Sequence, residues 1–179
     1  KLETKKGLNK FVWDLRYASV EKFEGLVLWN RSLAGARAIP GSYMATLNIA
    51  ENSQSVDFEV LADPRINSTQ DDYQTQFDFL TSINTKLTEM HRAINRIRAA
   101  KSQLKAIEKR IGEDQQFSGL AETSAQLRDT LSSIEETLYQ TKMESPQDPL
   151  NFPIRLNDKL AGVMSLAGFG DHAPSTSAM

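Results

Sequence analysis

Apolar side chains at seven-residue spacing run through the middle of this 179-residue chain and constrain its fold more than any other feature. Such a repeat lies along one face of an α-helix and is typical of a coiled-coil seam. We therefore predict one long helix over 69–111, with Thr69 or Ser68 as its N-cap and Gly112 at its end. The repeat forms two rows: Tyr73, Leu80, Leu87 and Ile94, then Ile83, Met90, Ile97, Leu104 and Ile111.

A second helix is predicted over 119–142, because Leu120, Leu127 and Ile134 repeat the same spacing. The connection between the two helices is short, so we expect them to fold back as an antiparallel hairpin. Residues 66–111 carry 8 basic and 5 acidic side chains, whereas residues 112–144 carry 2 basic and 7 acidic ones, and this charge difference favours the pairing. We expect these residues to face one another in the seam: Leu87, Ile94, Ile97, Leu127 and Leu131.

A short third helix is expected after Pro153, with Leu156, Leu160 and Val163 on one face. It is expected to pack on the hairpin as a partial third member of a bundle.

Residues 8–62 alternate apolar and polar side chains, which is typical of β-strands. Phe11, Trp13, Leu15 and Tyr17 would share one face of a first strand, residues 25–29 are a short apolar run, and segments 43–49 and 56–60 repeat the alternation. Four or five short strands with one apolar face need a second sheet to cover it, which indicates an immunoglobulin-like sandwich. The alternation stops at Asp63-Pro64, because proline cannot continue a strand ladder.

The predicted fold class is therefore α+β in two parts. An immunoglobulin-like β-sandwich occupies residues 1–65, and a long antiparallel helical hairpin with a short third helix, a three-helix bundle, occupies residues 66–167. Glycines, Pro174 and a Ser-Thr-Ser run predict a disordered tail over 168–179. The chain opens with Lys1 and shows no apolar signal core, so we expect a fragment of a longer protein; any export signal would lie upstream.

The composition excludes several classes of function. With no cysteine and two histidines, disulfides and zinc–thiolate sites are excluded. The net charge of -2 gives no overall attraction to nucleic acid. No apolar run is long enough to span a membrane. His91 lacks a second metal ligand on its helix face, because position 95 is Asn. We predict no catalytic residue, no cofactor and no metal site.

Asp14 and Arg16 are the most informative polar pair, because side chains two residues apart on a strand share one face. They could bind a ligand, but we favour a structural role in which they fix the loop 18–40 against the sheet. Trp13 and Trp29 could form an aromatic platform for a sugar; we favour core packing for both. Trp13, Asp14 and Arg16 are the candidates for structural or ligand contacts.

Three ordered segments resemble a known family. They are Gly-Leu-Asn-Lys-Phe-Val-Trp-Asp-Leu-Arg-Tyr at 7–17, Ile-Pro-Gly-Ser-Tyr at 39–43, and Asp-Pro-Arg at 63–65 ahead of the long helix. This order, with Arg-Leu-Asn-Asp-Lys-Leu at 155–160, resembles the C-terminal region of bacterial sortilin-type or Asp-box (neuraminidase-repeat) β-propeller proteins, often labelled glycosyl hydrolases. The front part is also similar to the immunoglobulin-like domain of the flagellar hook-capping protein. The family pattern has proline at two positions where this chain has alanine, Ala18 and Ala36.

The resemblance implies a noncatalytic accessory and interaction module at the C-terminus of an exported bacterial protein, periplasmic or extracellular. Its first partner would be the upstream propeller of the same chain. An envelope protein, or a second copy bound through the helices, would be a further partner. The Asp-box motif itself is not found in these residues.

Two other functions stay open at this point. The chain could complete a glycoside hydrolase site whose main part lies in the propeller, with Asp14 as a contributing residue. It could also be a cytosolic coiled-coil scaffold unrelated to glycans. On either the accessory or the scaffold reading, the chain alone is not an enzyme.

Overall fold

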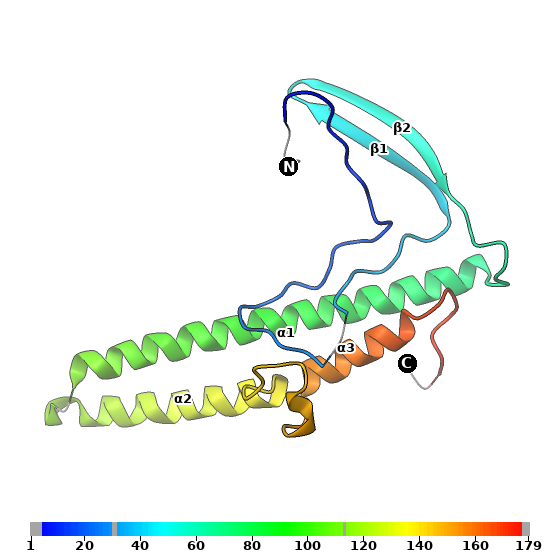
Figure 1. Cartoon of the computed structure of the whole chain (residues 1–179). Helices are drawn as coiled ribbons and strands as arrows, with labels where there is room; N and C mark the ends of the chain where they lie inside the picture. Colours follow the sequence, from blue (N-terminus) through cyan, green and yellow to red (C-terminus); the bar gives the residue numbers. More distant parts are fainter. Residues whose placement is uncertain (1–4, 30–31, 113, 177–179) are drawn as a thin grey trace.

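The structure, a computed structural model, describes residues 5–29, 32–112 and 114–176. It is an α+β fold in which a two-stranded antiparallel sheet projects from a layer of three helices (Figure 1). The sheet consists of β1 (Gly41–Ile49) and β2 (Asn52–Val60). The helices are α1 (Gln70–Ile111), α2 (Ser118–Leu138) and α3 (Leu156–Ala167), with short 3-10 turns at Gln115–Phe117 and Asp148–Leu150.

The predicted long helix is confirmed. α1 has 42 residues and begins at a capping box: the Thr69 hydroxyl accepts the Asp72 N–H, and the Asp72 carboxylate accepts the Thr69 N–H. It ends at Gly112, whose φ of 56° is in the left-handed region that favours glycine. At 1.5 Å per residue α1 is about 63 Å long, twice the length of α2.

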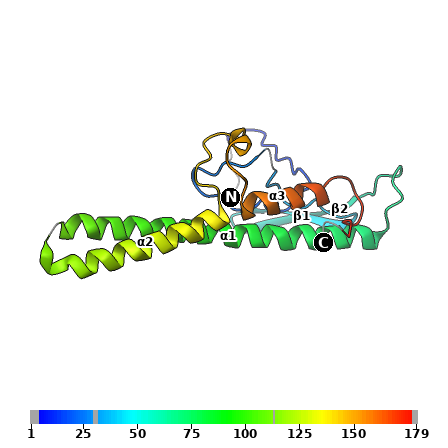
Figure 2. The ribbon, with the colours of Figure 1, turned by 90° about the horizontal axis from the view of Figure 1, so that it is seen from below.

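The two shorter helices cover α1 one after the other. α2 lies antiparallel beside the C-terminal half of α1, and α3 lies beside its N-terminal half (Figures 1 and 2). The helical hairpin is therefore confirmed, and the third helix packs on α1. At most positions along α1, however, only one partner helix is present.

The immunoglobulin-like sandwich was a wrong prediction. The described residues before Gly41 form no strand and hold one isolated bridge, between Arg16 and Arg37. Leu15 has a φ of 59°, which ends the alternation expected of a strand through Tyr17. Residues 18–29 and 32–38 instead pack on the helices, which supply the cover that a second sheet would have given. The later strand predictions, 43–49 and 56–60, are confirmed as the β1–β2 hairpin.

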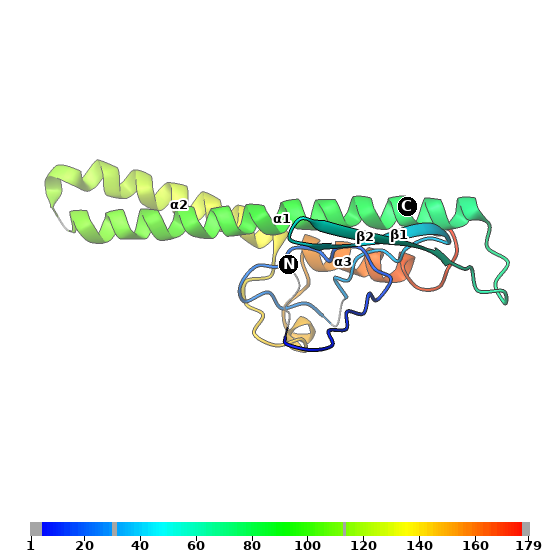
Figure 3. The same cartoon turned by 90° about the horizontal axis from the view of Figure 1, so that it is seen from above.

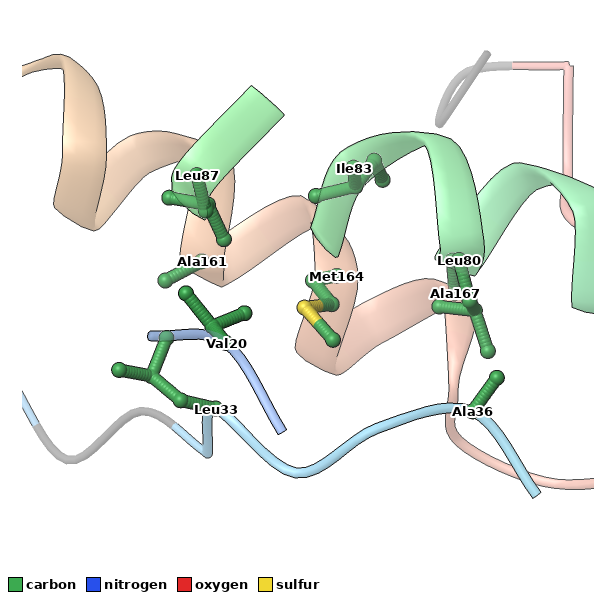
Figure 4. Packing of buried hydrophobic residues seen from close by; sticks show 9 residues of the cluster. All are labelled: Val20, Leu33, Ala36, Leu80, Ile83, Leu87, Ala161, Met164 and Ala167. Carbon is green, nitrogen blue, oxygen red and sulfur yellow. The ribbon is translucent and has the colours of Figure 1, made fainter. Parts of the chain in front are cut away.

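The main core joins the N-terminal segment to the helices. Figure 4 shows its nine buried side chains: Val20, Leu33 and Ala36 from the N-terminal segment, Leu80, Ile83 and Leu87 from α1, and Ala161, Met164 and Ala167 from α3. A second cluster contains Phe23, Ile94 and Tyr139. The boundary at Asp63-Pro64 thus separates two kinds of secondary structure, while the core spans both sides of it.

The end of the chain also contacts α1. The Gln76 side-chain amide donates to the carbonyls of Ala167 and Gly170, and the Ser68 hydroxyl donates to the Asp171 carbonyl. The expectation of a disordered tail from residue 168 therefore does not describe residues 168–171. Residues 177–179 lie outside the described residues.

The hairpin seam differs from the prediction in its apolar pairing. Leu87 is fully buried, but it packs against Val20 and Ala161 because α2 does not extend that far along α1. Leu127 is 48% exposed and lies at the edge of the seam. The expectation that Leu87 and Leu127 face one another was therefore wrong.

This difference predicts unequal effects of the same truncation. Leu87→Ala should lower the free energy of unfolding by about 2–5 kcal/mol, because it leaves a cavity in the core. Leu127→Ala should lower it by less than about 1 kcal/mol, because that side chain is half exposed. Urea unfolding followed by circular dichroism measures both. Equal losses in the two variants would show that α2 is placed incorrectly along α1.

Candidate functional site

The three residues singled out in the sequence form one tight turn. The Trp13 indole Nε1 donates to the Arg16 carbonyl at 2.8 Å, and the Arg16 backbone N–H donates to Asp14 Oδ1 at 3.0 Å. These two bonds enclose Leu15 and its left-handed backbone conformation. Trp13 and Asp14 are therefore used to hold the turn.

Arg16 connects this turn to the following loop. Its Nη1 donates to the Gly35 carbonyl at 2.9 Å. Gly35 lies in the segment 33–38, which runs antiparallel to residues 15–20. The two segments approach closely here: a Cβ on Gly35 would lie 2.2 Å from the Tyr17 carbonyl oxygen and 2.5 Å from that of Ala18. Only glycine fits at this position.

Trp13 also packs on the base of the β-hairpin. Its ring centroid lies 5.8 Å from that of Tyr43 and 6.2 Å from that of Phe58, and Tyr43 and Phe58 stack on each other as a cross-strand pair. The Tyr43 hydroxyl donates to the Ile39 carbonyl. Burial is the main cause that raises the pKa of this phenol above its ordinary value. Trp29 is in a different place: its backbone N–H donates to Asp158 at the start of α3.

One face of the β-hairpin is apolar and exposed. Strand register places seven apolar side chains on the same face, which we call the hairpin face: Tyr43, Ala45, Leu47, Ile49, Val56, Phe58 and Val60. Trp13 covers only its base, and Leu47, Ile49 and Val56 are 51%, 63% and 64% exposed. The opposite face is mostly polar, with a hydrogen bond between the Thr46 and Ser55 hydroxyls. An apolar face of this kind is typical of a contact surface.

Polar side chains are buried where α1, α2 and the loop near Phe23 meet. Glu135 accepts from Arg98 Nε at 2.7 Å and Lys101 Nζ at 3.0 Å, and its side chain is 4% exposed. Burial alone would raise the pKa of Glu135, but the bonds from Arg98 and Lys101 outweigh it and hold that pKa below its ordinary value. The Arg98 guanidinium lies over the rings of Phe23 and Tyr139.

His91 belongs to the same junction. It is 1% exposed, its Nδ1 lies 2.7 Å from the Glu21 carbonyl oxygen, and its ring meets Phe23 edge to face. Burial lowers the pKa of His91, and the hydrogen bond to Glu21 opposes this only in part. A neutral ring that donates from Nδ1 fits these contacts. The loop that covers His91 could not be foreseen from helix periodicity.

Chemistry at these sites is limited by what the side chains already bind. Across residues 5–29, 32–112 and 114–176, no three or more His, Asp or Glu side chains gather so as to hold a metal ion. Asp57 and Glu59 lie on the face of β2 opposite the hairpin face. The site that the geometry supports is therefore the hairpin face with Trp13 at its base.

Gly35→Ala should lower the free energy of unfolding by about 1–3 kcal/mol, because the added methyl would displace the backbone of Tyr17 and Ala18. Gly119→Ala is the matched control: its methyl meets no atom within 4 Å, and alanine favours helix, so stability should stay equal or rise by up to about 1 kcal/mol. Chemical denaturation measures both. An unaffected Gly35→Ala would contradict the close approach of the two segments.

His91 should make stability depend on pH. The pKa of His91 is lowered in the folded state. As the pH falls below about 6.5, the ordinary pKa of histidine, the unfolded chain therefore takes up a proton before the folded chain does. The stabilising effect of the neutral ring is thus complete above about pH 6.5 and is lost as the pH falls toward the lower folded-state pKa.

The groups that face His91 are Glu21, which is paired with Arg92, and the Phe23 ring. We expect the loss of unfolding free energy between pH 7.5 and pH 5 to be smaller in His91→Gln than in the parent chain. His172→Gln is the control, because that histidine is exposed and should leave the parent profile unchanged. Identical pH profiles in all three proteins would exclude His91 as the cause.

Comparisons with known proteins add no relative. The chain matches no protein-family model, and neither the curated proteins nor the solved structures contain a significant match to it. Within the part of the chain that the structure describes, no helix is both long and apolar enough to cross a bilayer. The hairpin face, defined by its own geometry, is the basis for a function.

Proposed function

We propose that this chain is a noncatalytic interaction module whose hairpin face docks on the part of the same polypeptide that precedes it. Segments 7–17, 39–43 and 63–65 resemble the C-terminal region of bacterial Asp-box β-propeller proteins. On that basis, the preceding part would be a β-propeller of an exported bacterial protein. The observation that carries the proposal is the exposed hairpin face on a sheet that stands away from the helices (Figure 1).

A two-stranded sheet of this kind needs a further layer. Isolated hairpins are marginally stable in water, and three or more strands or a packed layer are needed for independent stability. In the described structure, Trp13 covers the base of the face but leaves Leu47, Ile49 and Val56 exposed. The missing layer would come from a surface that brings its own apolar side chains.

The position of the N-terminal segment favours the preceding part of the polypeptide as that layer. The N-terminal segment rises on the same side of the helical layer as the β-hairpin (Figure 1), and seen from above it lies to one side of the sheet (Figure 3). Leu8, Phe11 and Val12 in this segment are also exposed. A domain connected there would stand beside the hairpin face and could bury these side chains with it.

The contacts of the candidate polar residues fit an accessory role better than a catalytic one. The Asp14 carboxylate accepts the Arg16 N–H, and the Arg16 guanidinium reaches Gly35. A glycosidase needs two carboxyl groups on opposite sides of the scissile bond. The helical hairpin, at the far end of the molecule, remains free to contact a second protein.

The test has two steps. The coding sequence upstream of Lys1 should encode a signal peptide and a propeller with Asp-box repeats; a different upstream sequence would refute the propeller assignment. The preceding segment and the 179-residue chain are then produced separately and mixed. Trp13 fluorescence follows binding, because this indole lies at the base of the hairpin face.

Leu47→Glu should weaken binding at least tenfold, because it places a charge on the hairpin face. Asn48→Glu is the matched control on the opposite face of β1, and its Kd should stay within twofold of the parent value. Equal effects of the two substitutions would refute docking through this face. Concentration-dependent dimerisation that Leu47→Glu abolishes would assign the face to a second copy and overturn the proposal.

A further inference from the structure

Two arginines are held directly opposite one another near the middle of the molecule. Arg16 and Arg37 form an antiparallel bridge, with the Tyr17 N–H bonded to the Ala36 carbonyl at 2.9 Å and the Ala38 N–H bonded to the Leu15 carbonyl at 2.7 Å. These flanking bonds make Arg16 and Arg37 a non-hydrogen-bonded pair, the arrangement in which opposing side chains are closest. Like charges placed directly opposite are destabilising unless an anion lies between them.

Both arginines line one cavity between the N-terminal segment, α1 and α3. The cavity has a volume of about 140 Å³, and its wall includes Ser32 and Gln76 as well as Ser165 on α3. The Ser165 hydroxyl is buried and has no hydrogen-bond partner among the described residues. Ser165 is thus one of the residues that line the cavity, and its buried hydroxyl costs free energy as long as it has no partner, which is a second, independent indication of a ligand.

The guanidinium groups of the two arginines have different partners. Arg37 pairs with Asp171 at 3.1 Å, whereas Arg16 bonds the neutral carbonyl of Gly35. No acidic residue lines the cavity itself in the described part of the chain. Asp171 thus pairs with the Arg37 guanidinium and Asp14 bonds only the backbone N–H of Arg16, so the Arg16 guanidinium keeps N–H donors for an anion beside the cavity.

The size of the cavity limits the ligand. A liquid water occupies about 30 Å³, so the space accommodates a few waters or one small anion. Pockets for drug-sized ligands measure about 300–1,000 Å³, so a sugar or a nucleotide would not be enclosed. We infer that this cavity binds a carboxylate group, held by the guanidinium groups of Arg16 and Arg37 and by the Ser165 hydroxyl as donor.

Thermal unfolding of the 179-residue chain tests the site with sodium acetate as the probe and sodium chloride at equal ionic strength as the reference. When acetate exceeds its Kd fivefold, Tm should rise by about 2–4 °C relative to chloride. Sodium phosphate at equal ionic strength should give a smaller rise, because the inferred ligand is a carboxylate. No rise with acetate, or a larger rise with phosphate, would overturn the assignment.

Variants separate this cavity from general salt effects. Ser165→Ala should fold with an unchanged or raised Tm and weaken acetate binding at least fivefold, and Arg37→Gln should abolish the acetate effect. Arg110→Gln, which removes an exposed arginine at the far end of α1, is the control and should keep the full effect. Retention of the acetate effect in both Ser165→Ala and Arg37→Gln would overturn the inference.

A further measurement with peptides distinguishes a carboxylate at the C-terminus of a peptide from a free small acid. An N-acetylated dialanine with a free C-terminal carboxylate is compared with its C-terminal amide in the same measurement. A rise in Tm with the acid and not with the amide would assign the site to a carboxylate carried by a peptide. An equal rise with both would overturn carboxylate recognition, and a rise with acetate alone would assign the site to a free small acid.

Discussion

Everything in this fold depends on the apolar row of α1, which is too long for any one partner to bury. At about 63 Å the helix passes through successive surroundings, to which several parts of the chain contribute. Near its start, α3 and the N-terminal segment cover Leu80, Ile83 and Leu87. Farther along, Phe23 and Tyr139 cover Ile94. An irregular N-terminal segment is therefore held in place by a regular helix.

Local signals in the sequence were sufficient for the helices and the β-hairpin. Thr69, Asp72 and Gly112 mark the ends of α1 through capping chemistry, which depends only on neighbouring residues. The end of α2 was predicted four residues too late. Tyr139 leaves the helix to bond the Gly25 carbonyl and pack under Phe23, and this contact across more than a hundred residues has no local signal.

The N-terminal half shows where periodicity misleads. Alternating apolar residues indicate that a segment has a buried side, but they do not identify what buries it. The same apolar side chains can pack on a second sheet or on helices. The sequence around Val20 and Phe23 therefore does not predict that α1 covers them. The sequence did identify Trp13, Asp14 and Arg16 as a group. The opposition of Arg16 and Arg37 depends on how the loop folds back at Gly35, which no spacing rule reveals.

The polar composition of the α1–α2 contact has a dynamic consequence. Between residues 98 and 138 of the described chain, apolar side chains such as Leu104 and Leu131 are only half-buried. Polar bonds join them in the contact: Glu108 bonds Arg128 and Ser124, and Glu135 bonds Arg98 and Lys101. Salt screens an ion pair more strongly the more it is exposed, and the Glu108 carboxylate nearer Gly112 is 23% exposed, against 4% for Glu135. The free energy of local opening therefore falls along α1 toward Gly112, so the far end of the helix pair separates and recloses while the core end stays folded.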